Sequence, residues 1–405
     1  MPDLRRAIGM PMLLFFGLGN ILGAGIYVLI GEVVAEAAIY APFAFMLASV
    51  IAGLSAFSYA ELSARFPHAA GEALYIQEGF GVTSVSRITG LLIALAGMVS
   101  AATITRGFHG YFSVFFTLDA AIVISAVVLL LGALTIWGVS QSVGTAAALT
   151  IVEIAGLLLV VWAGRDLLAS TPQHIPELLP PADVAVWTGI GLGAFIAFFA
   201  FIGFEDMVNV AEEVKNPGRN MPTAILLALL IATLMYASVS IVAVLALPVE
   251  ELAGSKAPLA DVLSVLVDYD PRFISGISML AIVNGALIQM VMASRLIYGM
   301  ASKGWLPKPL ASVNAATRTP VNATLIVIGI ILSLALWLPI QTLAMATSYI
   351  VLIVFTLVNA SLLAIRRREV KAGEGFQVPI WVPIAGLMAS LALIIFELSQ
   401  HWLAR

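Results

Sequence analysis

The chain is a succession of long apolar runs joined by short polar connections. A run of about 18 or more apolar residues is long enough to cross a bilayer as an α-helix. Of the 405 residues, 61% are hydrophobic and only 10% are charged, whereas soluble domains carry about 25% charged residues. The sequence therefore predicts an all-α membrane protein. We expect about eleven transmembrane helices, at about 8–30, 38–64, 84–106, 118–137, 141–164, 187–211, 219–247, 272–302, 320–337, 341–365 and 379–400.

The positively charged residues between the spans predict the orientation of the chain. Connections on the cytoplasmic side of a membrane are enriched in Lys and Arg. Most of the 19 Lys and Arg residues fall on the side of the N-terminus, so we expect a cytoplasmic N-terminus in the cell's inner membrane. We interpret the proline-containing connection 165–186 as a linker and the acidic connection 248–271 as a solvated outer loop. The net charge of -4 comes without a basic stripe, which argues against a nucleic-acid partner.

Two spans, the first and the sixth, are interrupted where a helix should be regular. The first contains Gly19, Gly23 and Gly25, and the sixth contains the run 198–205 with Gly203. Glycine costs about 1 kcal/mol relative to alanine in a helix interior. Unwound backbone at membrane depth is tolerated only where it lines a cavity or is buried in protein. Interruptions at matching places in two halves of a chain are typical of the binding site of a secondary transporter.

The spacing of the two interruptions predicts an inverted repeat. They lie five spans apart, and because five is odd, two blocks of five spans have opposite orientations in the membrane. We divide the chain into a first repeat, 1–165, a second repeat, 187–365, and a basic loop with an additional C-terminal span, 366–405.

Several motifs resemble those of the amino acid–polyamine–organocation superfamily. They are Gly19-Asn-Ile-Leu-Gly-Ala-Gly-Ile-Tyr-Val-Leu29, Tyr59-Ala-Glu-Leu-Ser-Ala-Arg-Phe-Pro67 with 70–75, Ala211-Glu-Glu-Val-Lys-Asn-Pro-Gly-Arg-Asn-Met-Pro222, and 294–307 with 319–322. The resemblance covers about residues 8–365 and is nearest to the bacterial relatives of cationic amino acid transporters. It implies a leucine-transporter-like fold of five plus five inverted spans, with broken first and sixth helices, that works by alternating access. Relatives commonly have twelve or more spans, whereas we find eleven.

A transported amino acid carries a carboxylate and an ammonium group, and unwound backbone can bind both. A half-helix N-terminus offers free N–H groups and about half a positive charge, so the break at 23–25 can bind the carboxylate. Carbonyl groups of Ile21 and of 199–202 can bind the ammonium. Alternatively, the glycines only permit close helix packing. The expected substrate-binding residues are Ile21, Gly23, Ala24, Gly25, Ile26, Phe199, Ala200, Phe201, Ile202 and Gly203.

Aromatic and small residues near the breaks predict how the substrate is covered and selected. The resemblance implies that Phe199 covers the substrate as a gate, although phenylalanine is also ordinary packing in a membrane core. The side-chain pocket is expected among spans one, three, six, eight and ten, which favours a neutral substrate side chain. The small or uncharged residues offered there are Ser100, Ala101, Thr103, Asn284 and Ser348.

Two carboxylates inside the spans are candidates for coupling transport to an ion, because ionisable groups at membrane depth are costly. Glu153 lies near the middle of the fifth span, where many relatives carry lysine, and can bind a proton or a cation. The alternative is a protonated structural group bonded to a neighbouring helix. Glu205 resembles the glutamate linked to proton sensing in arginine–agmatine antiporters, or it caps the half-helix that follows. We expect no metal site and no cofactor.

Together these features predict secondary active transport of amino acids, by proton coupling or exchange, and no enzymatic activity. A polyamine or another organic amine is the alternative substrate, and an amino-acid sensor without net transport is the alternative function. An ion channel fits a single chain with paired breaks poorly. Transport would run on gradients, because the sequence has no ATP-binding phosphate loop. The expected partners are the small-molecule amino acid or amine, the lipid bilayer, and protons or sodium.

Overall fold

The computed structural model describes residues 6–23, 25–68, 71–138, 143–267, 270–368 and 375–403. These residues form helices joined by short connections, and they contain no β-strand beyond an isolated bridge between Ile8 and Val214. The predicted site residue Ala24 and the first residues of the predicted fifth span, 141–142, lie outside the described residues.

The first half of the chain contains the predicted broken first span and four further spans. Its helices are α1 Met10–Leu22, α2 Gly25–Ala37, the 3₁₀ helix η1 Ala38–Tyr40, α3 Ala41–Arg65, α4 Gly71–Phe80, α5 Thr83–Phe112, α6 Ala120–Trp137 and α7 Val143–Ala163. Of these elements, only α4 lies outside the predicted spans. α4 lies in the connection that follows α3.

The second half begins with a second broken span and ends with the additional helix. Its elements are α8 Arg165–Leu178, α9 Val184–Ala197, the 3₁₀ helices η2 Phe198–Phe201 and η3 Glu205–Glu213, α10 Pro217–Ala246, α11 Val249–Gly254, α12 Pro258–Leu266, α13 Pro271–Ser302, η4 Lys308–Ala311, α14 Val321–Trp337, α15 Ile340–Arg368 and α16 Trp381–Leu403. Each predicted span therefore coincides with a helix or with a broken pair of helices.

The apolar helices have the lengths that a membrane protein needs. Within the described residues, 8 segments are long and apolar enough to cross a membrane. One of them, Met10–Arg65, contains both the first and the second predicted spans. Two shorter apolar helices, Leu149–Ala163 and Val321–Trp337, belong to the predicted fifth and ninth spans. The prediction of an all-α membrane protein is confirmed.

Two connections differ from the sequence-based expectation. The linker 165–186 contains α8, a helix that includes Pro172 and Pro176. The outer connection 248–271 contains α11 and α12 rather than an open loop. Leu252, Leu259 and Leu263 of these two helices are buried, so the hydrophobic effect folds this connection onto the bundle.

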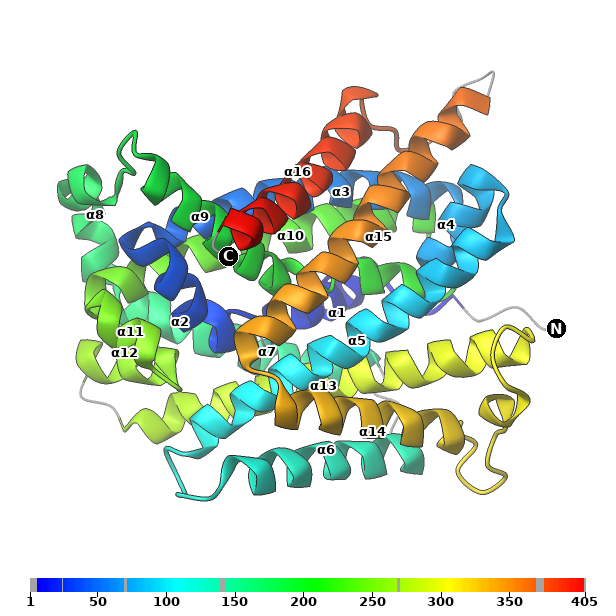
Figure 1. Ribbon diagram of the computed structural model, residues 1–405, viewed down its shortest axis with the longest axis horizontal. Coiled ribbons are helices and arrows are strands. Elements are labelled where there is room, and N and C mark those ends of the chain that lie inside the picture. The colour runs from blue at the N-terminus through cyan, green and yellow to red at the C-terminus, as the bar shows by residue number, and fades with distance from the viewer. Residues whose placement is uncertain are drawn as a thin grey trace.

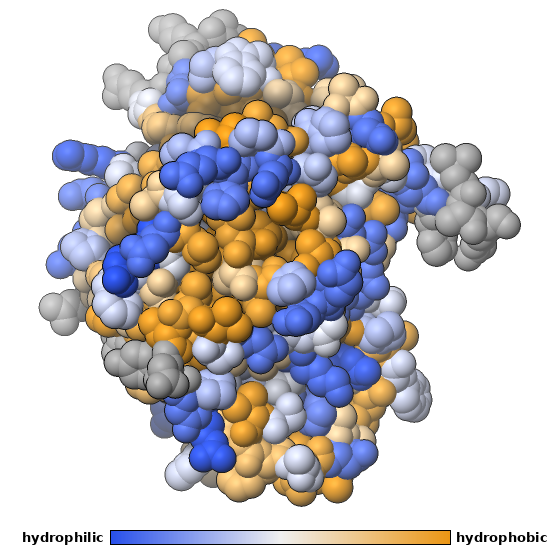
Figure 2. All heavy atoms as spheres, turned by 90° about the vertical axis from the view of Figure 1, so that its left-hand side faces the viewer, coloured by the Kyte–Doolittle hydropathy of each residue, from blue (hydrophilic) through white to orange (hydrophobic). Residues whose placement is uncertain are grey.

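The helices run roughly parallel to one axis of the bundle, which gives it two ends (Figure 1). The α11 end carries α8, α11 and α12, and the α4 end carries α4 and the C-terminal end of α13. Figure 2 looks onto the α11 end, where hydrophilic residues surround a hydrophobic centre.

The broken helices lie in the middle of the bundle, and each half of a broken helix packs against other long helices. α1 packs on α7 and α10, while α9 packs on α2 and α3. The most extensive contacts join α3 to α10 and α5 to α13. These pairs are the second and seventh, and the third and eighth, of the predicted spans. The pairing agrees with an inverted repeat, whose boundaries stay a prediction.

Candidate functional site

The two breaks lie directly against each other. A Cβ atom added to Gly25 would lie 2.5 Å from Ala200 Cα, and one added to Gly203 would lie 2.6 Å from Asn20 O. Gly203 also has a φ of +131°, which other residues rarely adopt. Glycine is therefore needed at both breaks because backbone approaches backbone, a packing role that is compatible with a binding role.

A tyrosine from a third helix joins the two breaks. The Tyr236 hydroxyl of α10 lies 2.5 Å from Ile21 O and 2.9 Å from Ala200 O. One hydroxyl proton serves both carbonyl groups, so each keeps capacity to accept a further hydrogen bond. These carbonyls belong to the set expected to bind an ammonium group.

A small cavity lies beside this contact. It is bounded by the first break, the second break, α5 and α13. Its lining residues are Asn20, Ile21, Gly25, Ser100, Ile104, Phe199, Ile202, Gly285, Ile288 and Gln289. Four of the predicted substrate-binding residues, Ile21, Gly25, Phe199 and Ile202, are therefore brought together around one space.

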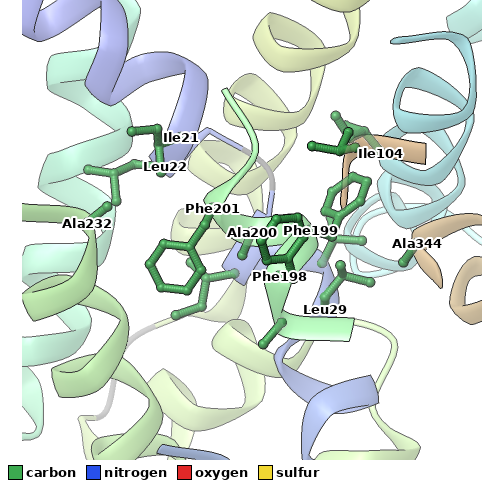
Figure 3. Packing of buried hydrophobic residues seen from close by; sticks show 14 of the residues in the cluster. Ile21, Leu22, Leu29, Ile104, Phe198, Phe199, Ala200, Phe201, Ala232 and Ala344 are labelled. Atoms are coloured by element: carbon green, nitrogen blue, oxygen red, sulfur yellow. The ribbon is translucent and has the colours of Figure 1, made fainter. Parts of the chain in front are cut away.

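The other predicted binding residues are placed differently. Ile26, Ala200, Phe201 and Gly203 are buried but are not among the lining residues. Figure 3 shows Phe199 pointing towards Ile104 and Phe201 pointing the other way. The Phe201 ring packs against Tyr236, with ring centroids 5.1 Å apart. Phe199 therefore faces the cavity, whereas Phe201 packs against Tyr236.

Asn20 is a site residue that the sequence-based prediction missed. Its side-chain oxygen and nitrogen are both buried and have no hydrogen-bond partner among the described residues, and it lines the cavity. An unsatisfied buried polar group costs about 1–3 kcal/mol, so such a group at a cavity wall is suited to a polar ligand. A polar amide within an apolar span was the available signal.

Glu153 of α7 lies beside the first break. Its Oε1 accepts a hydrogen bond from Asn284 Nδ2 at 2.8 Å, while its Oε2 is buried and has no hydrogen-bond partner in the described parts of the chain. A Cβ atom on Gly23 would be 3.9 Å from this Oε2. The side chain is 1% exposed. Thus Gly23 faces Glu153, and the free oxygen is available to a proton or a cation.

Glu205 is attached to the second break. Its Oε2 accepts a hydrogen bond from the backbone N–H of Gly203 at 2.8 Å. The carboxylate therefore holds the backbone within the break itself, two residues before its own position. A change in the charge of Glu205 would act directly on that backbone.

A second small cavity adjoins the first and reaches Glu72 of α4. It shares Ser100, Ile202 and Gln289 with the first cavity. Its lining residues are Tyr59, Glu72, Ile93, Ala96, Gly97, Ser100, Ile202, Glu205, Asp206, Gln289, Met292, Val351, Val354 and Phe355.

Two carboxylates of this second cavity, Glu72 and Asp206, were not among the predicted site residues. Tyr59 Oη donates a hydrogen bond to Glu72 Oε1 at 3.2 Å, and Gln289 Nε2 donates one to Asp206 Oδ2 at 3.1 Å. Burial raises the pKa of the Glu72 carboxyl to about 7. Glu72 lies on α4, far from the break in sequence, so no local pattern could have placed it here.

Comparison with known proteins identifies the family. The model of a family described as amino acid permease matches residues 8–400. The chain belongs to this amino acid permease family. Its members are transporters and not enzymes, which agrees with a bundle of apolar helices around a buried, partly polar cavity.

Curated relatives of this family member carry different substrate names. The cationic amino acid transporter 3, mitochondrial, of Arabidopsis thaliana is 30% identical over 390 residues, which are 90% of this chain and 63% of the relative. The branched-chain amino acid permease BcaP of Lactococcus lactis subsp. cremoris is 30% identical over 415 residues, 93% of this chain and 86% of the relative. The methylthioribose transporter of Bacillus subtilis is 26% identical over 412 residues. The chain spans about three fifths of the length of the plant relatives.

Proposed function

We propose that the protein is a secondary active transporter of amino acids that works by alternating access across the cytoplasmic membrane, with its N-terminus in the cytoplasm. The observation that carries this proposal is the contact of two broken helices around a buried cavity whose wall includes the unpaired amide of Asn20. Family membership supports it, and so does the excess of Lys and Arg in the connections predicted to lie on the side of the N-terminus.

The substrate backbone is recognised at the breaks. The carboxylate lies at the start of α2, where the N-terminal N–H groups around Gly25 are oriented towards an anion. The ammonium group lies at the carbonyl oxygens of Ile21 and Ala200, beside Tyr236. Asn20 contributes one donor and one acceptor to the same substrate.

The substrate side chain enters an uncharged part of the first cavity. Ile104, Phe199 and Ile288 offer apolar contact there, which supports a neutral amino acid such as leucine. The names of the relatives make arginine the second substrate to test.

Glu153 couples transport to protons. Its free Oε2 lies beside Gly23, so protonation or deprotonation changes the charge next to the first break. None of the ion pairs of the described residues includes Glu153. A carboxylate buried without a cation is favoured in its neutral form, which suits a group that carries a proton across the membrane.

The test is transport by the purified protein in proteoliposomes. Labelled leucine, arginine and putrescine are offered to liposomes that contain the same unlabelled compound. We expect counterflow of leucine or arginine, and accumulation that depends on an inward pH gradient. Saturable conductance without counterflow would indicate a channel. Binding without any counterflow would indicate a sensor, and counterflow of putrescine alone would indicate an amine carrier.

A further inference from the structure

The second cavity gathers three carboxyl groups without a positive side chain. Glu72 of α4 and Glu205 and Asp206 of η3 line it, and none of its lining residues is Lys, Arg or His. Each of the three is less than a tenth exposed. Desolvation and mutual repulsion both favour the neutral form of such groups. The cluster must therefore hold a proton or another cation.

A second, independent observation comes from α5. Ser100 is 4% exposed and lines both cavities. Its hydroxyl makes no hydrogen bond to any described residue. The hydroxyl is thus available to a mobile polar species at the junction of the two cavities.

The acidic cluster is connected to the substrate cavity by two hydrogen bonds. Glu205 holds the Gly203 N–H of the second break at 2.8 Å. Asp206 holds Gln289 Nε2 at 3.1 Å, and Gln289 lines both cavities. The other amide atom, Gln289 Oε1, lies against Gly97 of α5, where an added Cβ would approach it to 3.2 Å. Gln289 therefore joins the acidic cluster to the wall of the first cavity.

We propose that Glu72 and Asp206 form an exchangeable proton-binding pair on the cytoplasmic side of the substrate cavity, and that Gln289 transmits the state of this pair to the substrate. The inference rests on the proposed transport function and adds an inner proton site to it. In each cycle, one carboxylate oxygen forms an O–H bond with a proton from cytoplasmic water, and the same bond breaks when the proton returns to water.

The amide of Gln289 can distinguish the two states. Ionised Asp206 accepts a hydrogen bond from Nε2, whereas protonated Asp206 donates one to Oε1 after the amide has rotated. The amide atom on the side away from Asp206 therefore changes from an acceptor to a donor, at a residue that lines both cavities. Gln289 is a positioning residue in this scheme, because the orientation of its side-chain amide decides whether a donor or an acceptor is presented.

The surroundings of Glu72 favour its titration near neutral pH. Burial raises the pKa of Glu72 to about 7. The α5 and α15 residues of the wall are uncharged. The polar and titratable groups that face the pair are Tyr59 of α3, Tyr75 of α4, Glu205 of η3 and Gln289 of α13.

Two variants test the pair, Glu72→Gln and Asp206→Asn, because each keeps the side-chain size but cannot titrate. Counterflow of labelled leucine or arginine is measured at internal pH 5.5 to 8.5 with the external pH fixed. A group with a pKa near 7 changes its protonated fraction about tenfold between pH 6 and pH 8. We expect the wild-type rate to change by a similar factor and each variant to change by less than about twofold.

The matched control is Glu78→Gln, which removes an exposed carboxylate of the same helix, α4. It should keep the wild-type pH profile. Wild-type profiles in both Glu72→Gln and Asp206→Asn would overturn the proposal, and so would a flattened profile in Glu78→Gln. Replacing sodium with choline separates the two cations: a profile that disappears without sodium would mean a sodium site and contradict the proton pair.

Gln289→Met tests the transmission. Methionine has a similar length but has no donor and no acceptor. We expect a flattened internal-pH profile in this variant, with measurable counterflow retained. A purely structural role would change the rate at every pH equally, and a preserved profile would exclude Gln289 as the transmitting residue.

Thermal unfolding in detergent tests the titration without transport. Because the pKa of Glu72 in the folded protein lies above its value in water, folding takes up a proton between about pH 4.5 and about pH 7. Stability should therefore fall as the pH rises through this window, and Glu72→Gln should lack that part of the slope. Equal slopes would overturn the proton pair. Wild-type liposomes without counterflow of any tested compound would instead contradict the proposed function.

Discussion

The two helix breaks differ in the source of their polar groups. The first break takes its carboxylate from another helix, since Glu153 of α7 lies beside Gly23. The second break carries its own, since Glu205 binds the Gly203 N–H within the same segment. The carboxylate beside the first break can therefore move with another helix, α7, whereas the carboxylate of the second break moves with its own segment.

The breaks also differ in how the helix resumes. α1 ends at Leu22 and α2 begins at Gly25, so regular helix returns almost at once. After α9, the chain continues as the 3₁₀ helices η2 and η3 as far as Glu213. Helices of the 3₁₀ type have poorer hydrogen-bond geometry and are usually short. We infer that the second break is the more easily rearranged of the two.

Gly25→Val should have the largest effect, because it separates the two breaks. The added side chain meets Ala200 Cα, a backbone atom that cannot move away cheaply. We expect the variant to enter the membrane but to lose substrate binding by more than about 100-fold, as the carbonyls of both breaks lose their relative positions. Binding of labelled leucine and arginine to purified protein measures this effect.

The control for this change is Gly276→Val in α13, where no atom lies within 4 Å of an added Cβ. It should bind normally. Normal affinity in Gly25→Val would mean that the substrate does not bind at the breaks.

Glu153→Gln should separate exchange from accumulation. Glutamine keeps the shape of the side chain and its bond with Asn284 but cannot release a proton. We expect exchange to continue while accumulation driven by a pH gradient fails. Glu153→Lys, which introduces the charge of many relatives, should yield transport that is insensitive to external pH. Uptake over a series of external pH values, with and without sodium, measures both.

The comparison of the two breaks decides how this result is interpreted. If wild type and Glu153→Gln show the same dependence on external pH, Glu153 is structural. Glu205, the carboxylate of the second break, then becomes the remaining candidate among the two residues singled out from the sequence.

Tyr236→Phe should weaken both breaks at once. The hydroxyl that lies between Ile21 O and Ala200 O is lost, at a cost of about 1–2 kcal/mol. Substrate binding should therefore weaken by about 5- to 30-fold. Tyr40→Phe is the matched control, since no hydrogen bond of its hydroxyl occurs among the described residues. An unchanged affinity in Tyr236→Phe would show that the breaks hold each other without this link.

The spans could be predicted from sequence because a bilayer restricts the chain to helices. Apolar length alone located all of them, and glycine located both interruptions. α11 and α12 were missed because burial of Leu252 and Leu259 against the bundle stabilises them, and short helices of this kind have weak local signals. Two of the four prolines in the predicted linker 165–186, Pro172 and Pro176, lie inside α8.

Part of the candidate site could be predicted from local backbone. The positions of the two breaks were located, because glycine reports the conformation of its own segment. Of the partners that arrive from other helices, Glu153 and Ser100 were singled out from the sequence, whereas Tyr236 of α10 and Glu72 of α4 were missed. Hydrophobicity and spacing do not encode which distant side chains meet, since that depends on the packing of the whole bundle.

Phe199→Ala should have the smallest effect and should separate the two aromatic residues of the second break. Phe199 lines the cavity, whereas Phe201 packs on Tyr236. Removing the Phe199 ring takes away apolar contact with the substrate, so we expect the apparent binding constant to rise by about 3- to 10-fold and selectivity between leucine and larger amino acids to loosen. Phe201→Ala should instead lower the thermal stability, as truncations of buried phenylalanine commonly cost about 3–5 kcal/mol. Kinetics for several amino acids and unfolding temperatures of both variants test this division. If Phe199→Ala keeps wild-type kinetics for every amino acid, Phe199 is not a gate, and the aromatic residues of the second break serve packing alone.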